Sequence, residues 1–420
     1  MMVRIKLVIV LLSALIVAYG FVGGVIDTAA VSNDVYQDLS VFMDILHKIR
    51  DEYVEEPNMN RAIKGALQGM VESLDPYSSF VDGETYSELA ERRGTDAASP
   101  GLVLSKRFGY AYVVSVLPGS PAEAQGLRTA DVVESIEGRT TSAMSLWEAE
   151  SRLMGESGSQ VEVRVIRARR TQPASIVLER RKTRLREPSG RMEEEGIGVL
   201  RIPHFNSGVS QSLSQELKDL KSSGLAGLLI DVRGTALGDL GEAVSVASLF
   251  LPQGTLAARL KNRKGQEEEL TTQAEPVFPS GPVLILTDRG TSGAAEVFTA
   301  ALHDHQRAET LGERTNGQGG VQESFRLQDG SRLILATQRV FRPSGEAVQA
   351  EGPRDSGVAP DVRWPEQDFE TNFYYDNVPE DASEELGDEY YRRLAEAVEK
   401  EQLRKAVEKI RERLLNKKAA

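Results

Sequence analysis

Two short apolar runs are the features that most constrain the fold of this 420-residue chain. Leu228–Ile230 and Val283–Leu286 contain only aliphatic residues. A strand that is apolar on both faces needs cover on both faces, which is typical of central strands in an α/β sheet. Helical patterns alternate with such strands at Leu213–Lys221, Leu240–Phe250 and Ala294–His303. The sequence therefore predicts an α/β layer over residues 196–365.

The composition limits the partners and cofactors to be expected. The chain has 63 acidic and 50 basic side chains, a net charge of -13 that repels phosphate backbones, so we expect no nucleic-acid binding. It has no cysteine, which excludes disulfides, thiolate metal sites and a Cys nucleophile. Four histidines are few for His-rich metal chemistry: His47, His204, His303 and His305. We expect neither a metal nor another cofactor.

An uncharged segment near the N-terminus predicts membrane attachment. Leu7 to Ile26 is a run of 20 residues without a charge, long enough at 1.5 Å per residue to cross the ~30 Å core of a bilayer. Arg4 and Lys6 precede it, so the positive-inside rule places the rest of the chain across the membrane. A cleaved signal peptide, with an apolar region of about 7–15 residues, is the alternative. We expect residues 1–29 to be a single-pass inner-membrane anchor with an extracytoplasmic, periplasmic body.

The remaining chain divides into four parts by pattern. Residues 30–95 show helical spacing, residues 97–183 hold short β-type runs around one helical stretch, and residues 184–365 carry the α/β pattern. Residues 366–420 begin as an acidic linker and become helical. Near the end, apolar residues step by 4, 3 and 4 at Leu403, Val407, Ile410 and Leu414. Such a seam is buried either in an oligomer contact or on the chain's own body, and periodicity alone leaves both open.

Residues 118–138, PGSPAEAQGLRTADVVESIEG, resemble the PDZ signature. The resemblance implies that the loop and strand upstream receive the C-terminus of a peptide, at Gly101, Leu102, Val103 and Leu104. Backbone N–H groups in such a loop bind a carboxylate, and the peptide adds a strand to the edge of the sheet. The alternative is a β-rich module without a ligand.

Further motifs are spread along the core. They are GMVESLDPYSSF (69–80), GLLIDVRG (227–234), VASLFLPQG (246–254), GAAEVFTAALHDHQRA (293–308), GERTNGQGGVQ (312–322), RVFRPSG (339–345) and GVAPD (357–361). With the PDZ-like module, residues 30–365 resemble the C-terminal processing peptidases, also called tail-specific proteases. The resemblance implies an α/β (α+β) protease-like core with an inserted PDZ-like module, an N-terminal transmembrane helix and helical extensions at both ends. It also implies recognition of polypeptide C-terminal tails. Active members use a Ser nucleophile and a Lys base.

The residues that perform this chemistry are absent. Active relatives carry Ser-Ala-Ser-Ala-Ser-Glu, whose middle Ser attacks, and the matching stretch here places Gly293 at that position. The Lys of relatives lies in Gly-Lys-Gly, and the match 25 residues after Gly293 is Gln318. A Gln side chain is neutral and cannot take a proton from a hydroxyl. Gln322 matches the Gln that orients the Lys in relatives, but its partner is missing.

The turn that forms the oxyanion hole also departs from the family. Relatives have Asp-Leu-Arg-x-x-Pro-Gly-Gly, and here Leu237 replaces the first Gly of the pair while Gly238 keeps the second. If that first Gly uses a backbone angle that Leu disfavours, the N–H donor will point elsewhere.

Substitutes for the lost groups are few. Ser292 is the fallback nucleophile, but no lysine occurs between Lys264 and Lys400 to act as its base. His303 lies ~15 Å from Gly293 along the predicted helix. His303-Asp304-His305 is similar to a metal motif, yet neighbouring helical positions do not face one ion, so we assign these residues a structural role.

Three functions are therefore compared. The first is a catalytically inactive family member that binds polypeptide C-termini, or scaffolds an active protease or envelope complex as a homo- or hetero-oligomer. The second is an active serine endopeptidase with a displaced nucleophile. The third is a structural oligomer with a vestigial groove. Because removal of the nucleophile or its base costs about 10⁶ in kcat, we favour the first.

Overall fold

The computed structural model describes residues 33–419 except 95, 168–171, 351–354 and 365–383. The predicted anchor at residues 7–26 lies outside this part of the chain. Within the described residues, no helix combines the length and apolar character needed to cross a membrane. The contacts divide the chain into two compact units, Met1–Ala66 and Leu67–Ala420.

The first unit contains helix α2 (Asn33–Glu52) and the first half of α3 (Met59–Glu72), in the part of the chain, residues 30–95, where the sequence predicted helices. The Asn58 side chain begins α3 by accepting a hydrogen bond from the backbone N–H of Arg61 at 3.0 Å. Large apolar side chains of α2 remain exposed, among them Leu39 and Ile45. Helix α2 therefore has apolar side chains that its own unit does not bury.

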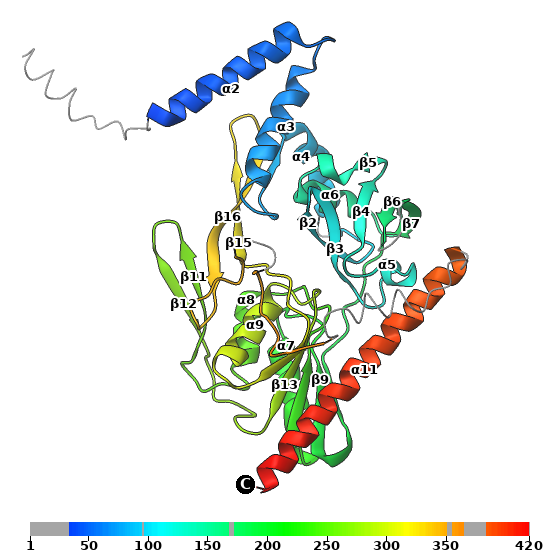
Figure 1. The fold of residues 1–420 in the computed structure, drawn as a ribbon, viewed down its shortest axis with the longest axis vertical. Helices are drawn as coiled ribbons and strands as arrows, with labels where there is room; N and C mark the ends of the chain where they lie inside the picture. Colours follow the sequence, from blue (N-terminus) through cyan, green and yellow to red (C-terminus); the bar gives the residue numbers. More distant parts are fainter. Residues whose placement is uncertain (1–32, 95, 168–171, 351–354, 365–383, 420) are drawn as a thin grey trace, which may run out of the picture. The chain divides into compact units, whose positions relative to one another are not determined.

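The second unit is built on a six-stranded sheet with the order β17-β14-β13-β10-β9-β8 (Figure 1). Its strands are β8 (Ser189–Met192), β9 (Ile197–Arg201), β10 (Gly227–Asp231), β13 (Val283–Thr287), β14 (Glu309–Gly312) and β17 (Val362–Arg363). All neighbouring pairs are parallel except β8 with β9. The two apolar runs form the neighbouring strands β10 and β13, with Leu228 opposite Val283. The predicted α/β layer is confirmed.

Three helices cover one face of this sheet: α7 (Val209–Ser222), α8 (Leu240–Ala247) and α9 (Ala294–Asp304). Side chains alternate between the two faces along each strand, so Ile230 and Ile285 join the helices' core while Leu229 and Leu284 face the other way. Phe298 of α9 packs against the rings of Phe205 and Phe250 in this core, at centroid distances of 5.4 and 6.0 Å.

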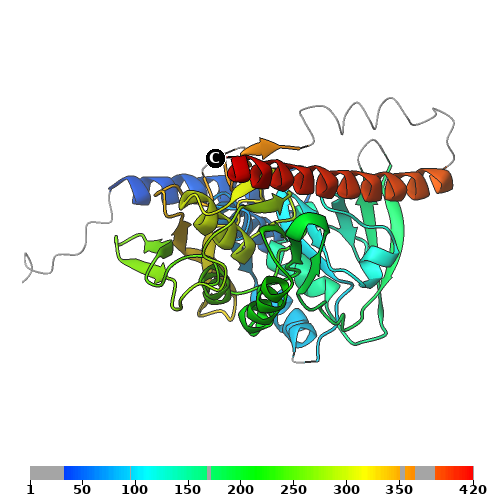
Figure 2. The ribbon, with the colours of Figure 1, turned by 90° about the horizontal axis from the view of Figure 1, so that it is seen from below.

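The C-terminal helix α11 (Glu384–Ala419) covers the other face of the sheet (Figures 1 and 2). Ala406 and Ile410 are 0% and 1% exposed there, and Leu403, Val407 and Leu414 pack around them. A Cβ on Gly227 of β10 would lie 2.6 Å from Ile410, so the helix approaches the strand closely. The apolar seam of residues 403–414 therefore lies on the chain's own body.

A second, antiparallel sheet joins distant parts of the chain, and sequence reasoning did not anticipate it. It has the order β1-β16-β11-β12, and β15 pairs with β16. The strands are β1 (Ser79–Val81), β11 (Leu256–Asn262), β12 (Glu267–Thr271), β15 (Gly320–Arg326) and β16 (Arg332–Phe341). Because Ser79 pairs with Ile334, the segment before the PDZ-like module is part of the protease-like core.

The PDZ-like module is a sheet of order β2-β3-β4-β6-β7, with β5 beside β4. The strands are β2 (Leu102–Arg107), β3 (Tyr110–Val116), β4 (Val132–Ile136), β5 (Arg139–Thr140), β6 (Gln160–Ile166) and β7 (Ala174–Glu179). Helices α5 (Pro121–Ala124) and α6 (Leu146–Leu153) complete it, with short 3-10 turns at η2 (Thr141–Ala143) and, beyond the module, η3 (Glu194–Gly196). The core is aliphatic, and Val113, Val133 and Val163 are fully buried.

Helix α4 (Gly83–Ala90) and the 3-10 turn η1 (Glu91–Arg93) fasten this module to the segment before it. The Tyr86 ring stacks on Trp147 of α6 at 5.2 Å, and the Arg93 guanidinium lies 5.3 Å from the same indole. Arg92 pairs with Glu137 at 2.8 Å. Residues that precede the module therefore pack directly on its helix.

Truncation of a buried side chain in the seam should destabilise the protein more than truncation of an exposed side chain on the same helix. We expect Ile410→Ala to lower the free energy of unfolding of the core by ~2–5 kcal/mol, because it leaves a cavity between α11 and the sheet. Leu415→Ala, whose side chain is 58% exposed on the same helix, is the matched control and should change it by less than about 0.5 kcal/mol. Urea denaturation followed by circular dichroism measures both, and equal effects would contradict this packing.

Candidate functional site

The two positions predicted for the nucleophile and its base lie together at the start of α9. Gly293 caps the helix with φ 59° and ψ −113°, a conformation that side-chain-bearing residues rarely adopt. A Cβ built on Gly293 would lie 3.5 Å from Oε1 of Gln318. A side chain at position 293 would thus point at the side chain of residue 318.

A buried carboxylate holds these two positions in place. Oε2 of Glu296, in the first turn of α9, accepts hydrogen bonds from the N–H groups of Gly293 at 2.9 Å and Gln318 at 2.8 Å. Oε1 accepts from the N–H of Gly317 at 2.6 Å and from the Thr315 hydroxyl. Burial raises the pKa of Glu296, and these four donors oppose that shift. Glu296 therefore joins the loop before β15 to the start of α9.

Within the described part of the chain, the hydroxyl of Ser292, the fallback nucleophile, hydrogen-bonds to side-chain amides only. Its Oγ donates to Oε1 of Gln318 at 3.0 Å and accepts from Nδ2 of Asn316 at 3.0 Å. Neither amide can take the hydroxyl proton, and the residue is 1% exposed. This arrangement supplies a hydroxyl without a base and without access for a peptide.

Two other hydroxyls in this region do contact carboxylates. Thr291 Oγ1 lies 2.9 Å from the backbone carbonyl oxygen of Val232 and 3.1 Å from Oδ1 of Asp288, which share its one hydrogen, and Thr315 donates to Glu296. Thr291 is 0% exposed and Thr315 is 4% exposed, so a substrate carbonyl cannot reach them. Both contacts satisfy buried polar groups of the scaffold.

The turn after β10 tolerates the change at position 237. Leu237 is absent from the residues with positive φ, whereas Gly238 has a φ of 141°. A Cβ on Gly238 would lie 2.4 Å from the side chain of Phe205 and 2.5 Å from its backbone. The close approach therefore requires glycine at 238, and the backbone strain considered for Leu237 does not arise. The N–H of Gly234, earlier in the turn, donates to Asp288 at 2.8 Å.

The predicted peptide-binding residues lie at one edge of the PDZ-like sheet. Gly101 has a φ of 89°, and a Cβ there would lie 2.2 Å from that of Ser120, so only glycine fits. Leu102 and Val103 begin β2, which is the end strand of the sheet in the described residues, while Leu104 is buried in the module's core. An end strand that starts at a tight glycine loop can accept an added peptide strand.

Three site residues escaped sequence reasoning. The Tyr112 hydroxyl of β3 donates to Oδ1 of Asn316 at 2.8 Å, and Nδ2 of Asn316 donates to the Tyr77 hydroxyl at 3.0 Å. Tyr77 and Asn316 fall within motifs that mark the family, but 239 positions separate them and no local pattern links them. Gln322, which matches the Gln that orients the Lys in relatives, is exposed on β15 opposite Ala336.

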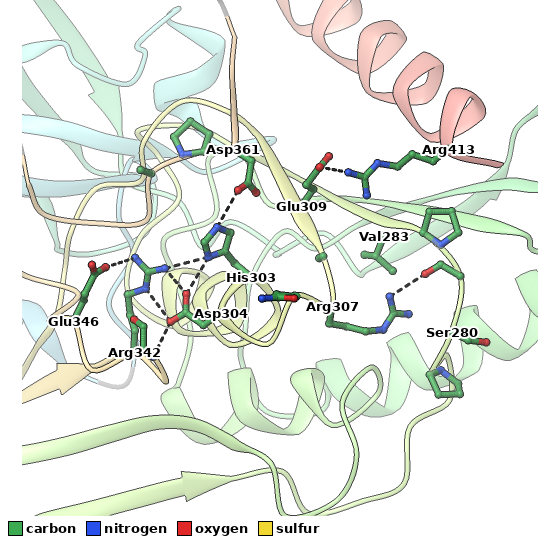
Figure 3. Close-up of a pocket in the computed structure, with 18 residues that line it drawn as sticks. Ser280, Val283, His303, Asp304, Arg307, Glu309, Arg342, Glu346, Asp361 and Arg413 are labelled. Atoms are coloured by element: carbon green, nitrogen blue, oxygen red, sulfur yellow. Dashed lines mark hydrogen bonds and ion pairs between the residues drawn. The ribbon is translucent and has the colours of Figure 1, made fainter. Parts of the chain in front are cut away.

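His303, near the end of α9 opposite Gly293, lines a pocket of about 980 Å³ (Figure 3). His303 contacts Asp304 at 2.9 Å through Nδ1 and Asp361 at 3.2 Å through Nε2. Arg342 pairs with Asp304 on the same side. His305 instead contacts the carbonyl of Leu256 at 2.7 Å, so the two histidines face different partners. This cluster joins α9 to residues 342 and 361.

Family models match three parts of the chain. Residues 196–364 match "Peptidase family S41", residues 112–167 match "PDZ domain", and residues 24–85 match "Activating protease CtpB N-terminal domain". These matches follow the order of the α/β core, the β-rich module and the helical segment before it.

Several proteins named as C-terminal processing proteases are similar to this chain over two thirds or more of their length. A carboxy-terminal-processing protease of Bartonella bacilliformis is 28% identical over 331 residues, 78% of this chain and 75% of the relative. The carboxy-terminal processing protease CtpA of Bacillus subtilis is 26% identical over 75% of this chain and 68% of its own. Among solved structures, the photosystem II D1 C-terminal processing protease superposes with a TM-score of 0.63 at 26% identity, covering 76% of this chain and 86% of its own.

The His303 cluster should make stability depend on pH. The hydrogen bond to Asp304 raises the pKa of His303 above its ordinary value of 6.5, and Asp361 adds to the shift. This contribution to folding is complete below pH 6.5 and is lost as pH rises through the raised pKa. We expect His303→Asn to remove this loss between about pH 6 and about pH 9, whereas His47→Asn, at an exposed position of α2, should keep it. Urea midpoints across this range are the measurement, and an unchanged slope in His303→Asn would refute the assignment.

Proposed function

Because the chain is a homologue of the carboxy-terminal processing proteases, with peptidase family S41 and PDZ domains, we propose that it binds polypeptide C-termini without cleaving them. The observation that carries this proposal is the pairing of Gly293 with Gln318. Position 293 faces residue 318 as a nucleophile would face its base, but the first has no side chain and the second is an amide.

The alternative, an endopeptidase that uses Ser292, has weaker support. General-base catalysis needs an acceptor within about 3 Å of the hydroxyl, and Ser292 meets only the amides of Gln318 and Asn316. Removing either a triad Ser or its base costs about 10⁶ in kcat. The loss of both groups therefore favours a pseudoprotease over a protease with a displaced nucleophile.

Tail binding is the role that the PDZ domain supports. The similar proteins are named for processing at the carboxy terminus, and we extend only the recognition of such tails to this chain. Gly101 supplies the tight loop for the terminal carboxylate, and the end strand β2 supplies the edge to which a tail adds. Half-buried Leu102 lies where it would contact the last apolar side chain of the tail.

The cellular setting forms part of the proposal. The uncharged run at residues 7–26 supports a single-pass anchor in the inner membrane, with the PDZ and protease-like domains outside the cytoplasm. The exposed apolar side chains of α2, including Leu39, Val41 and Ile45, support association with a second copy or with an active protease. In this setting the protein holds a tail for a partner to process or scaffolds an envelope complex.

The absence of catalysis can be tested directly. We expect the full chain in detergent neither to cleave an unfolded protein nor to react with a fluorophosphonate probe, because no base activates a hydroxyl. Gly293→Ser alone should also stay unlabelled, since Gln318 cannot take its proton. Labelling of the unaltered chain that disappears in Ser292→Ala would instead establish the displaced nucleophile.

Tail binding has a separate test. We expect Leu102→Asp to weaken binding of a fluorescent peptide with an apolar C-terminal residue by about tenfold or more, because it places a charge against an apolar side chain and beside the tail's carboxylate. Val177→Asp, on the exposed face of β7 in the same module, is the control and should not change the affinity. Equal affinities in fluorescence anisotropy would show that β2 is not the binding edge.

A further inference from the structure

We propose that the degenerate centre now serves as a docking surface, on which neutral side chains in place of the catalytic pair hold the chain's own PDZ domain against the core. This inference goes beyond tail binding and does not depend on it. It concerns how the residues that replaced the catalytic groups are used.

A continuous chain of hydrogen bonds crosses from the PDZ domain to Gln318. The Tyr112 hydroxyl of β3 donates to Oδ1 of Asn316 at 2.8 Å, and Nδ2 of Asn316 donates to Ser292 Oγ at 3.0 Å. The Ser292 hydroxyl then donates to Oε1 of Gln318 at 3.0 Å. Each donor in this series meets an acceptor, so the amide at 318 completes the series that begins in the PDZ domain.

A branch of the same network enters the hydrophobic core of the PDZ domain. Nδ2 of Asn316 donates its second hydrogen to the Tyr77 hydroxyl at 3.0 Å. The Tyr77 ring is 8% exposed and packs in the PDZ cluster with Leu104. Asn316 of the core therefore hydrogen-bonds to two residues that pack in the PDZ domain, Tyr112 and Tyr77.

Residues of β3 contact the turn after β10 directly. The Ser115 hydroxyl donates to the carbonyl of Gly234 at 2.6 Å. A Cβ on Gly290 would lie 2.8 Å from Cα of Gly234 and 3.0 Å from the carbonyl oxygen of Val114, so the three segments touch without room for a methyl group. The turn that serves hydrolysis in active relatives is here covered by a PDZ strand.

The side chains of this hydrogen-bond network are all neutral, and a lysine at position 318 would place a charge among them. Lysine at position 318 has no acceptor for the Ser292 hydroxyl and adds a cation beside Ser292, which is 1% exposed. The carboxylate of Glu296, which accepts from the backbone N–H of residue 318, already accepts from four donors. Residue 318 is half-buried, so a cation there would be partly desolvated beside the buried Ser292, a cost that would favour separation of the two domains.

The experiment measures the distance between the two domains in the full chain. Because the chain has no cysteine, Val177→Cys on β7 and Glu268→Cys on β12 place spin labels at two exposed sites only. Double electron–electron resonance should give one narrow distance distribution for this labelled chain. Gln318→Lys should broaden the distribution or add a second population, whereas Gln322→Lys, which places the same charge on exposed β15, should not.

A second variant keeps the test decisive if Gln318→Lys fails to fold. Asn316→Asp replaces the side-chain amide at the centre of the network with a carboxylate. The change removes the Nδ2 group that donates to Tyr77 and Ser292, and it adds a negative charge. We expect it to broaden the same distribution while far-UV circular dichroism stays unchanged. If folded Gln318→Lys or Asn316→Asp gives the same narrow distribution as Gln322→Lys, the proposed docking role is overturned.

Discussion

The buried carboxylate of Glu296 is the interaction on which the geometry of the site depends. It accepts hydrogen bonds from the backbone of Gly293 in one segment and from Gly317 and Gln318 in another, so the start of α9 and the loop before β15 cannot move independently. A group with no exposed surface must have its hydrogen bonds satisfied inside the protein. The carboxylate thus fixes the geometry of two segments around positions 293 and 318, whose side chains are a hydrogen and an amide.

Much of the fold could be predicted because its signals are local. The apolar runs became the paired strands β10 and β13, and the predicted helix after Gly293 became α9. The proximity of positions 293 and 318 followed from the family resemblance, since residues 25 positions apart carry no pairing signal of their own. The seam at residues 403–414 was ambiguous for a physical reason: an apolar stripe has the same period whether it packs on a partner or on its own sheet.

The rest depended on contacts between segments that are remote in the chain. The pairing of Ser79 with Ile334 and the bond between Tyr77 and Asn316 each join residues more than 200 positions apart, and neither leaves a periodic trace in the sequence. Backbone conformation was equally hidden at the turn after β10. The sequence there shows a glycine lost at 237, but only the approach of Phe205 shows that glycine is needed at 238.

The position of α11 in the chain has a consequence for biosynthesis. One face of the central sheet, including Leu229, Leu284 and Leu311, is covered by residues 403–414, which are the last of its packing partners to be synthesised. Until they emerge, that aliphatic face lacks the helix that packs on it, although the helices of the opposite face are already complete. The nascent chain therefore carries a water-exposed apolar surface late in translation, when a holding chaperone has most to contribute.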